Sequence, residues 1–547
     1  MQSTADGLWR LALKPATPEP PKNKTSVMRR MGFATLLMVA SVFLSRMVGF
    51  IREMVIAAQQ GATGATDAYF AAFTLPDMLN YFLAGGTLTI TFIPLFSEYL
   101  ARGDEDGGWD LFSTVATGTG SLLLLATLFG LWTAPWLVPL LTPGFDAEQL
   151  ELCVRMTRIV MPGMICFGIG GLLQATLLAR ERFAHVAAIP IVYNLMIIAG
   201  GVVLGPWVGI EGFAWGALAG SVIGPLLIPV WASRGQLRYS PRFNFRSKGF
   251  VRYLKLALPL MIGVSLISLD EWFLKYFGSE LDKGTISWLN NARRLMLVPV
   301  AIVGQAAGQA AMPFLSRLWS EGRTDEMAQT LTSAVRSVLF YAVLAATALA
   351  ALAQPVVFVA FHRGEFTAED ASGTAVLLAC FCAGIASWSV QGLVARGFYA
   401  RHDTLRPMLL GTTVAALSLP LYAWLGQTMG GPGLALASCA GITLNTLTLI
   451  FFFRRWCAPI NIGAIAGTLA AALACGLPAG AAAWGLVQYL SQHLSLESTW
   501  QGTIILVVSA AAFGAISLGL AFAMKRDELA FLKRIIARVT RRKAAAP

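Results

Sequence analysis

Arginines inside apolar stretches are the residues of this sequence best suited to chemistry. Arg46 and Arg52 lie in the first long apolar stretch, and Arg293 and Arg294 lie in the eighth. A charged side chain near the centre of a bilayer costs from about 3 to more than 10 kcal/mol, so such residues usually face water, a counter-ion or a ligand. Because guanidinium pairs well with phosphate, we expect Arg46, Arg52 and Arg294 to line a wet cavity that binds an anionic group.

Four further polar residues belong to this candidate site, and two of them have more than one interpretation. Arg293 either faces the cavity or pairs with Asp270 or Glu271 of the preceding stretch. Asp67 either caps the second helix or pairs with Arg52 across a short loop. The other two, Asp77 and Asn80, follow Pro76 in the second stretch, where Pro76, Gly85, Gly86 and Pro94 predict a broken helix.

A second polar cluster is predicted from three carboxylates, Asp270, Glu271 and Asp403. It could hold a coupling ion, Na⁺ or H⁺, or it could be an internal salt-bridge cluster that neutralises Arg293. The motifs around Arg363-Gly364 and His402-Asp403 contain turn and cap residues, so we expect them to have structural roles.

Composition places the chain in the membrane. Of 547 residues, 56% are hydrophobic and only 13% are charged, about half the charged fraction of a soluble domain. The sequence contains no nucleotide loop, zinc signature or catalytic triad, and the seven cysteines form no CxxC pair. These features indicate a protein that is not an enzyme and that has no cofactor or metal, with the coupling ion left open.

Fourteen apolar stretches are long enough to span a bilayer, which takes about 20 residues each. With the N-terminus in the cytoplasm, the basic residues fall in the inner loops, as the positive-inside rule requires. The sequence therefore predicts a multi-pass protein with both ends in the cytoplasm. Its basic C-terminal tail is expected to contact anionic lipids and not nucleic acid.

An internal repeat sets the expected architecture. Ile93-Pro94-Leu95-Phe96-Ser97 matches Met312-Pro313-Phe314-Leu315-Ser316 in the second half of the chain, and Gly212 and Gly220 match Gly433 and Gly441. Because six helices separate the copies, the repeat is parallel, with the substrate between the lobes. The expected fold is all-α, with two six-helix lobes and two extra C-terminal helices.

This architecture divides the chain into six parts. They are a disordered cytoplasmic tail (1–30), an N-lobe (31–235), a cytoplasmic linker (236–248), a C-lobe (249–456), helices 13 and 14 (457–525) and a basic cytoplasmic tail (526–547).

The motifs together resemble the lipid II flippase family (MurJ/MviN) of the multidrug/oligosaccharidyl-lipid/polysaccharide exporter superfamily. The matching residues spread over residues 40–410. They include Ser45-Arg46, Thr66-Asp67-Ala68-Tyr69-Phe70, Leu75-Pro76, Phe92-Ile93-Pro94, Pro143-Gly144-Phe145, Arg294-Leu295, Gly364, Phe366-Thr367 and Phe398-Tyr399-Ala400.

The resemblance implies a flippase that moves the undecaprenyl-pyrophosphate-linked peptidoglycan precursor, lipid II, to the outer leaflet of the bacterial cytoplasmic membrane by alternating access. It implies a cationic cavity containing Arg46, Arg52 and Arg294, with Asp67 at the head of the second segment. Helices 13 and 14 would form a groove for the lipid tail, and we expect a monomer.

Some residues depart from the family pattern. Asn80 stands in place of an arginine, Gly85 in place of a glutamate, and Arg293 in place of an aspartate. The changes either compensate one another or mark a flippase for another polyprenyl-linked glycan, of the O-antigen or capsule type. A drug–cation antiporter is disfavoured because an arginine-rich cavity repels cations, and a scaffold would need a carboxylate partner for every buried arginine.

Overall fold

The structure is a computed structural model that describes residues 24–83, 87–262, 266–524 and 528. Most of the two predicted tails (1–30 and 526–547) lies outside these residues, as do Gly85 and Gly86. The described chain is helical and contains no strand.

The first half of the chain forms helices from α2 to α11. Their bounds are α2 (Lys24–Gln60), α3 (Gly64–Ala72), α4 (Thr74–Leu83), α5 (Thr87–Ala101), α6 (Glu105–Leu141), α7 (Ala147–Val160), α8 (Gly163–Ala179), α9 (Phe183–Val208), α10 (Glu211–Ser221), the π-helix η1 (Val222–Leu227) and α11 (Ile228–Ser233).

The second half begins after an extended linker. Its elements are α12 (Lys248–Ile262), α13 (Leu266–Gly278), α14 (Thr285–Pro299), the π-helix η2 (Val300–Gln305), α15 (Ala306–Ser320), α16 (Thr324–Ala351), α17 (Ala353–Phe361), α18 (Ala368–Cys382), α19 (Ile385–Tyr399), α20 (Leu405–Trp456), α21 (Ile462–Ser491) and α22 (Thr499–Ala523).

Nine helices or continuous helix runs in the described chain are long and apolar enough to cross a membrane. The pair α18 and α19, bent by 47°, makes a tenth. The prediction of a polytopic all-α membrane protein is therefore confirmed at this level, whereas the number fourteen stays a prediction.

The predicted break in the second segment occurs between α3 and α4. α3 ends at Ala72 and α4 begins at Thr74, whereas the predicted break at Gly85 and Gly86 lies outside the described residues. Pro94 lies inside α5 without ending it, so this proline is not one of the breaks. The break places Asp67 on α3 and Asp77 on α4.

Two glycines share a backbone geometry that agrees with the internal repeat. Gly209, between α9 and α10, has φ 59° and ψ −138°, and Gly430, inside α20, has φ 62° and ψ −139°. Each lies three positions before a glycine of the matched pair Gly212 and Gly433. At Gly430 the chain leaves helical geometry, so α20 consists of two helices. A straight helix of 52 residues would be about 78 Å long, well over twice the thickness of a bilayer core.

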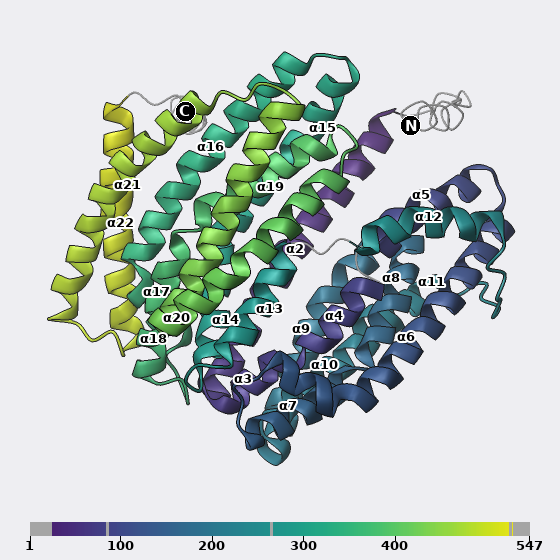
Figure 1. The fold of residues 1–547 in the computed structure, drawn as a ribbon, viewed down its shortest axis with the longest axis horizontal. Helices are drawn as coiled ribbons and strands as arrows, with labels where there is room; N and C mark the ends of the chain where they lie inside the picture. The colour runs from purple at the N-terminus through teal and green to yellow at the C-terminus, as the bar shows by residue number, and fades with distance from the viewer. Residues whose placement is uncertain (1–23, 84–86, 263–265, 525–527, 529–547) are drawn as a thin grey trace, which may run out of the picture.

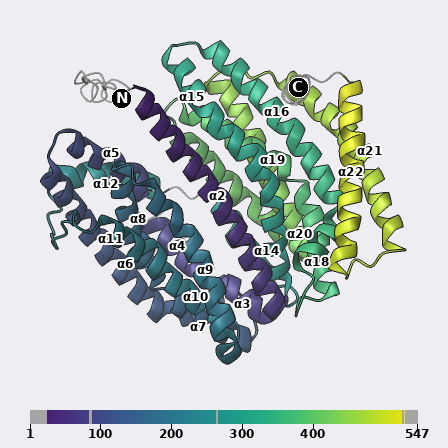
Figure 2. The ribbon, with the colours of Figure 1, turned by 180° about the vertical axis from the view of Figure 1, so that it is seen from behind.

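The helices gather into two groups that meet at one end of the molecule (Figure 1). α2 runs between the groups from the N-terminus towards α3 (Figure 2). The groups meet where α3 contacts α14 and where α2 contacts α17. We call this end, at which α3, α7, α14 and α18 begin, the closed end, and the opposite end the open end.

The hydrophobic cores mostly follow the two halves of the sequence, and α12 is the main exception. Tyr253 and Ala257 of α12 are buried in a cluster with first-half residues such as Phe96 and Phe112, whereas Leu274 of α13 is buried with second-half residues. α12 therefore packs against the first group, next to α5. The predicted lobe boundaries stay a prediction.

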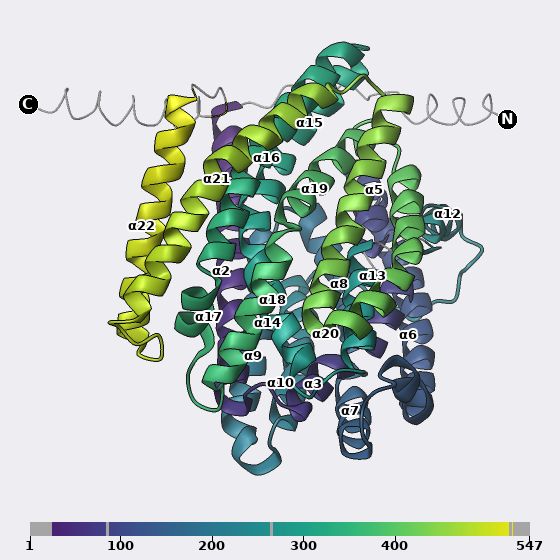
Figure 3. The same ribbon diagram turned by 60° about the vertical axis from the view of Figure 1, so that its left-hand side comes forward.

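α21 and α22 lie at the edge of the second group, beyond α16 and α17 (Figure 3). They pack on each other, α21 packs on α16, and α22 packs on α17. Several of their large side chains remain exposed, among them Leu477, Trp484 and Val507, as expected for helices that face lipid.

Replacing Gly430 with alanine should destabilise the fold. A backbone with positive φ and strongly negative ψ costs a residue with a side chain about 1–3 kcal/mol, and Gly209→Ala should act in the same way. The measurement is the thermal melting temperature of the purified protein. Gly467→Ala, in the interior of α21 with open space around it, is the control and should not lower it. Equal melting temperatures for Gly430→Ala and Gly467→Ala would contradict the repeat geometry.

Candidate functional site

One face of α14 carries several polar contacts between the two halves of the chain. Ser287, Asn290 and Arg294 follow one another at intervals of three and four residues, so they lie along one stripe of the helix. Ser287 contacts Asp67 of α3, and both Asn290 and Arg294 contact Glu53 of α2. The stripe therefore joins α14 to α3 at the closed end and to Glu53 of α2.

Asp67 caps α14 from the other half of the chain. Its carboxylate accepts hydrogen bonds from the Gly284 amide (2.6 Å), the Ser287 amide (2.8 Å) and the Ser287 hydroxyl (2.7 Å). The first amides of a helix have no partner within the helix and favour a negative charge. Neither sequence interpretation of Asp67 is what the structure shows, because Thr63 caps α3 and Arg52 pairs with Glu53.

Two loops at the closed end, one from each half of the chain, each contact the other half. The amide of Gly144 donates to the Ser279 hydroxyl, and the amide of Glu365 donates to the Ala58 carbonyl. A Cβ at Gly144 would lie 2.2 Å from the Ser279 carbonyl oxygen, and one at Gly364 would lie 2.1 Å from that of Ala58. Gly144 and Gly364 hold near-equivalent positions in the two copies of the repeat, and so do Ala58 and Ser279. The closed end is thus built from repeat-related contacts.

Glu53 is the shared counter-ion of two predicted site arginines. It is 1% exposed, and its carboxylate lies 2.5 Å from Arg52 and 3.3 Å from Arg294. Asn290 donates a third contact to it at 3.5 Å. Arg52 also donates to the side-chain oxygen of Asn194, at 3.0 Å. The structure therefore brings Arg52 and Arg294 together around one buried carboxylate.

Arg46 lies closer to the open end than this group. It is exposed, and its guanidinium donates to the side-chain oxygen of Gln305, the last residue of η2, at 2.8 Å. Six residues separate Arg46 from Arg52 on α2, a rise of about 9 Å. Arg46 is thus held by a partner of its own, apart from Glu53.

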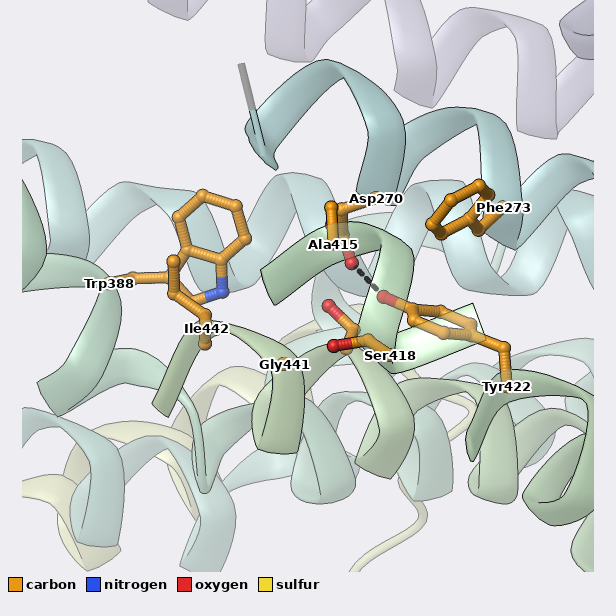
Figure 4. Close-up of a pocket in the computed structure, with 9 residues that line it drawn as sticks. Asp270, Phe273, Trp388, Ala415, Ser418, Tyr422, Gly441 and Ile442 are labelled. Carbon is orange, nitrogen blue, oxygen red and sulfur yellow. Dashed lines mark hydrogen bonds between the residues drawn. The ribbon is translucent and has the colours of Figure 1, made fainter. Parts of the chain in front are cut away.

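Arg293 points away from Arg294 into the second group of helices. It is 8% exposed, pairs with Asp270 and lies over the ring of Trp388. The hydroxyl of Tyr422 donates to the other carboxylate oxygen of Asp270 (Figure 4). Of the two interpretations of Arg293, the geometry supports the pair with Asp270, since a buried charge needs a partner.

The space beside Asp270 is too small for a headgroup. Asp270, Phe273, Trp388 and Tyr422 border a cavity of about 10 Å³ (Figure 4), close to the volume of one water probe. Glu271 faces Lys275 instead, at 3.8 Å. Asp403 precedes α20 at its start and pairs with Arg406. Tyr422 lies about five turns further along α20, roughly 28 Å along a helix, so the structure does not bring Asp403 to Asp270.

Asp77 and Asn80 line a different cavity, within the first group of helices. Its volume is about 270 Å³, and Phe167, Tyr193 and Ser221 also border it. Asp77 is exposed and lies within electrostatic range of Lys275 and Arg294 of the other half. The side-chain oxygen of Asn80 is buried without a hydrogen bond within the described chain.

The sequence pattern did not single out Glu53, Asn194 or Gln305 as site residues. Glu53 directly follows Arg52 in the sequence, and a carboxylate beside a membrane arginine was a usable signal. Asn194 and Gln305 approach α2 only through tertiary packing, so their single polar positions gave no pattern.

The all-helical fold, its apolar spans and the arginines between its two halves define a polytopic membrane transport protein. Within that class, the chain belongs to the lipid II flippase MurJ family, because the family model described as "Lipid II flippase MurJ" matches residues 56–502. The predicted family, and with it the assignment to a transporter and not an enzyme, is confirmed.

Individual relatives agree with the family match. The "Lipid II flippase MurJ" of Burkholderia cenocepacia is 28% identical over 439 residues, covering 77% of this chain and 84% of that protein. A solved structure, "Lipid II flippase MurJ, inward closed conformation", has a TM-score of 0.74 at 22% identity and covers 90% of this chain and all of that one. An inward-facing MATE transporter of the MOP superfamily has a TM-score of 0.62 at 14% identity, covering 76% of this chain and 97% of its own.

Removing the carboxylate of Asp67 should loosen the first turn of α14. Asp67→Ala leaves the amides of Gly284 and Ser287 without their acceptor, and loss of a helix cap costs about 0.5–2 kcal/mol. We expect hydrogen–deuterium exchange at residues 284–287 to accelerate about two- to thirty-fold. Asp104→Ala, which removes the cap of α6, should accelerate only α6. Unchanged exchange at 284–287 in Asp67→Ala would contradict the capping role.

The exposed pair of Asp146 and Lys283, 2.6 Å apart, should add to the local stability of the closed end, and this contribution should depend on salt and pH. The Gln149 amide and Lys283 lower the pKa of Asp146, and Asp146 raises the pKa of Lys283. The pair therefore contributes from above about pH 4 to about pH 10, and the contribution is lost as acid protonates Asp146. Lys283→Ala should accelerate exchange at 279–283 slightly at pH 7 and low salt. An effect that persisted in about 1 M salt, where the Debye length is only about 3 Å, would contradict a Coulombic origin.

Proposed function

We propose that this protein translocates lipid II, the polyprenyl-pyrophosphate-linked peptidoglycan precursor, across the bacterial cytoplasmic membrane. The family match over residues 56–502 carries the proposal. Buried Glu53, which pairs with Arg52 of the first half and Arg294 of the second, supports it, because two arginines in this position suit an anionic headgroup inside the membrane.

In this proposal Arg46, Arg52 and Arg294 receive the headgroup, and Asp77 and Asn80 border its path. The anionic oxygens of the pyrophosphate compete with Glu53 for the N–H donors of Arg52 and Arg294. Asp67 holds the closed end while the headgroup enters from the open end. Arg293 is the structural counter-ion of Asp270 and does not contact the cargo.

The finer architecture belongs to the same proposal. The chain makes fourteen passes with both ends in the cytoplasm, so that the closed end faces outward. Two six-helix lobes enclose the cargo, and α21 and α22 accommodate its lipid tail. The protein acts as a monomer, and its basic tail contacts anionic lipids. A coupling ion, if used, is not held at Asp270, because Arg293 and Tyr422 occupy both carboxylate oxygens.

A flippase for another polyprenyl-linked glycan is the second candidate. The departure that favours it is Asn80, where the family pattern has an arginine. In the structure, Arg293 does not replace this cation, because Asp270 neutralises it. The loss of one headgroup cation is therefore not compensated by Arg293.

Complementation distinguishes these functions. The chain should restore growth to a bacterium whose own lipid II flippase is shut off, and Arg294→Ala should abolish the rescue because Glu53 and the headgroup both lose a cation. Arg363→Ala, at the closed end away from these arginines, is the charge-matched control and should rescue fully. The measurements are survival, surface-exposed lipid II and the amount of each variant in the membrane.

Two results would count against the proposal. Normal growth of cells that depend on Arg294→Ala would refute the role of this arginine. Failure of the wild-type chain, when it is inserted and abundant, would refute lipid II as the cargo and favour the other glycan.

A further inference from the structure

Two arginines of the described chain converge on Gln305 without a carboxylate partner. Arg46 of α2 donates to the side-chain oxygen of Gln305 at 2.8 Å, and Arg396 of α19 donates to its backbone oxygen at 3.1 Å. Within the described residues, neither guanidinium forms an ion pair, whereas Arg52 and Arg294 share Glu53 and Arg293 has Asp270. The uncompensated positive charge among these arginines is therefore concentrated at Gln305.

The backbone around Gln305 is shaped to admit Arg396. η2 lies against α19 through Gly304, whose added Cβ would lie 2.7 Å from the Cα of Ser389. One turn after Gln305, a Cβ at Gly308 would lie 1.6 Å from a terminal nitrogen of Arg396. Because Gly308 has no side chain, the Arg396 guanidinium can pack directly against the backbone of α15. π-Helical turns such as η2 are frequent at functional sites.

The two guanidiniums retain most of their donors. Each has five N–H donors in a planar fork, and each contacts one neutral oxygen of Gln305. Gln305 itself is exposed, as are Arg46 and neighbouring Ile302. An incoming carboxylate can therefore reach both guanidiniums and form charge-assisted hydrogen bonds, which are stronger than bonds to a neutral amide.

We propose that Arg46, Arg396 and Gln305 form a second anion site, which binds a carboxylate of the peptide part of the cargo. The proposal rests on the proposed function, since it takes lipid II as the cargo. Arg46 lies about 9 Å from Arg52 along α2, and each is held by a different partner. The two phosphates of a pyrophosphate share one bridging oxygen, so the group is shorter than the rise of about 9 Å between Arg46 and Arg52. The site at Gln305 therefore takes a separate anionic group of the headgroup.

The test is a binding measurement on the full-length protein in lipid nanodiscs with three probes. They are lipid II with free peptide carboxylates, lipid II with these carboxylates amidated, and undecaprenyl pyrophosphate, which has no peptide. Wild type should bind the carboxylate form about tenfold more tightly than the amidated form. Arg396→Ala should remove this difference and leave the affinity for undecaprenyl pyrophosphate unchanged.

Two further variants separate charge from folding. Gly308→Ala displaces Arg396 without altering any charge and should also remove the difference. Gln305→Glu places a carboxylate between the two guanidiniums and should weaken binding of the carboxylate form by competition. Arg363→Ala should behave as wild type. Protein yield and melting temperature check that each variant is folded.

The outcomes are distinct. If Arg396→Ala weakens undecaprenyl pyrophosphate as much as lipid II, the site binds phosphate and the proposal is overturned. If no variant alters any affinity, Arg396 only fastens α19 to η2, and the proposal is again overturned. If wild type binds none of the three probes, the proposed function itself fails.

Discussion

A guanidinium in an apolar layer needs a counter-charge or a wet surface, and this constraint orders the interior of the molecule. Arg293 meets it with Asp270, deep in the second group of helices. Arg52 and Arg294 meet it together with Glu53. Breaking a buried pair costs several kcal/mol because it leaves one charge unpaired. The carboxylates thus assign Arg293 to the scaffold and Arg52 and Arg294 to the contact between the halves.

The closed end depends on the internal repeat. Asp67 and Ser287 bond to each other from near-equivalent positions of the two copies. At the same end, a glycine of each half packs against the backbone of the other half, Gly144 against Ser279 and Gly364 against Ala58.

The sequence predicted what depends on local pattern. Apolar length predicted the spans and Pro76 predicted the break between α3 and α4, and the matched backbones of Gly209 and Gly430 agree with the predicted repeat. Residue type marked the arginines but not their partners. Asp67 caps a helix in the other half of the chain, and Asp403 lies far from Asp270, because such pairings depend on helix packing and not on neighbours in the chain.

In the proposed function, the α14 stripe connects cargo binding to the closed end by competition for the same hydrogen-bond donors. Glu53 and an anionic headgroup require the same donors on Arg52 and Arg294, so the headgroup gains its full interaction only as Glu53 gives up part of its own. Glu53 also accepts from Asn290, one turn from Ser287, whose amide and hydroxyl bind Asp67. Releasing Glu53 therefore weakens a link between the halves next to the cap that closes the molecule. If the closed state of the protein strengthens the Glu53 contacts, then by thermodynamic reciprocity the closed state binds the anion more weakly than the open state, by the same factor.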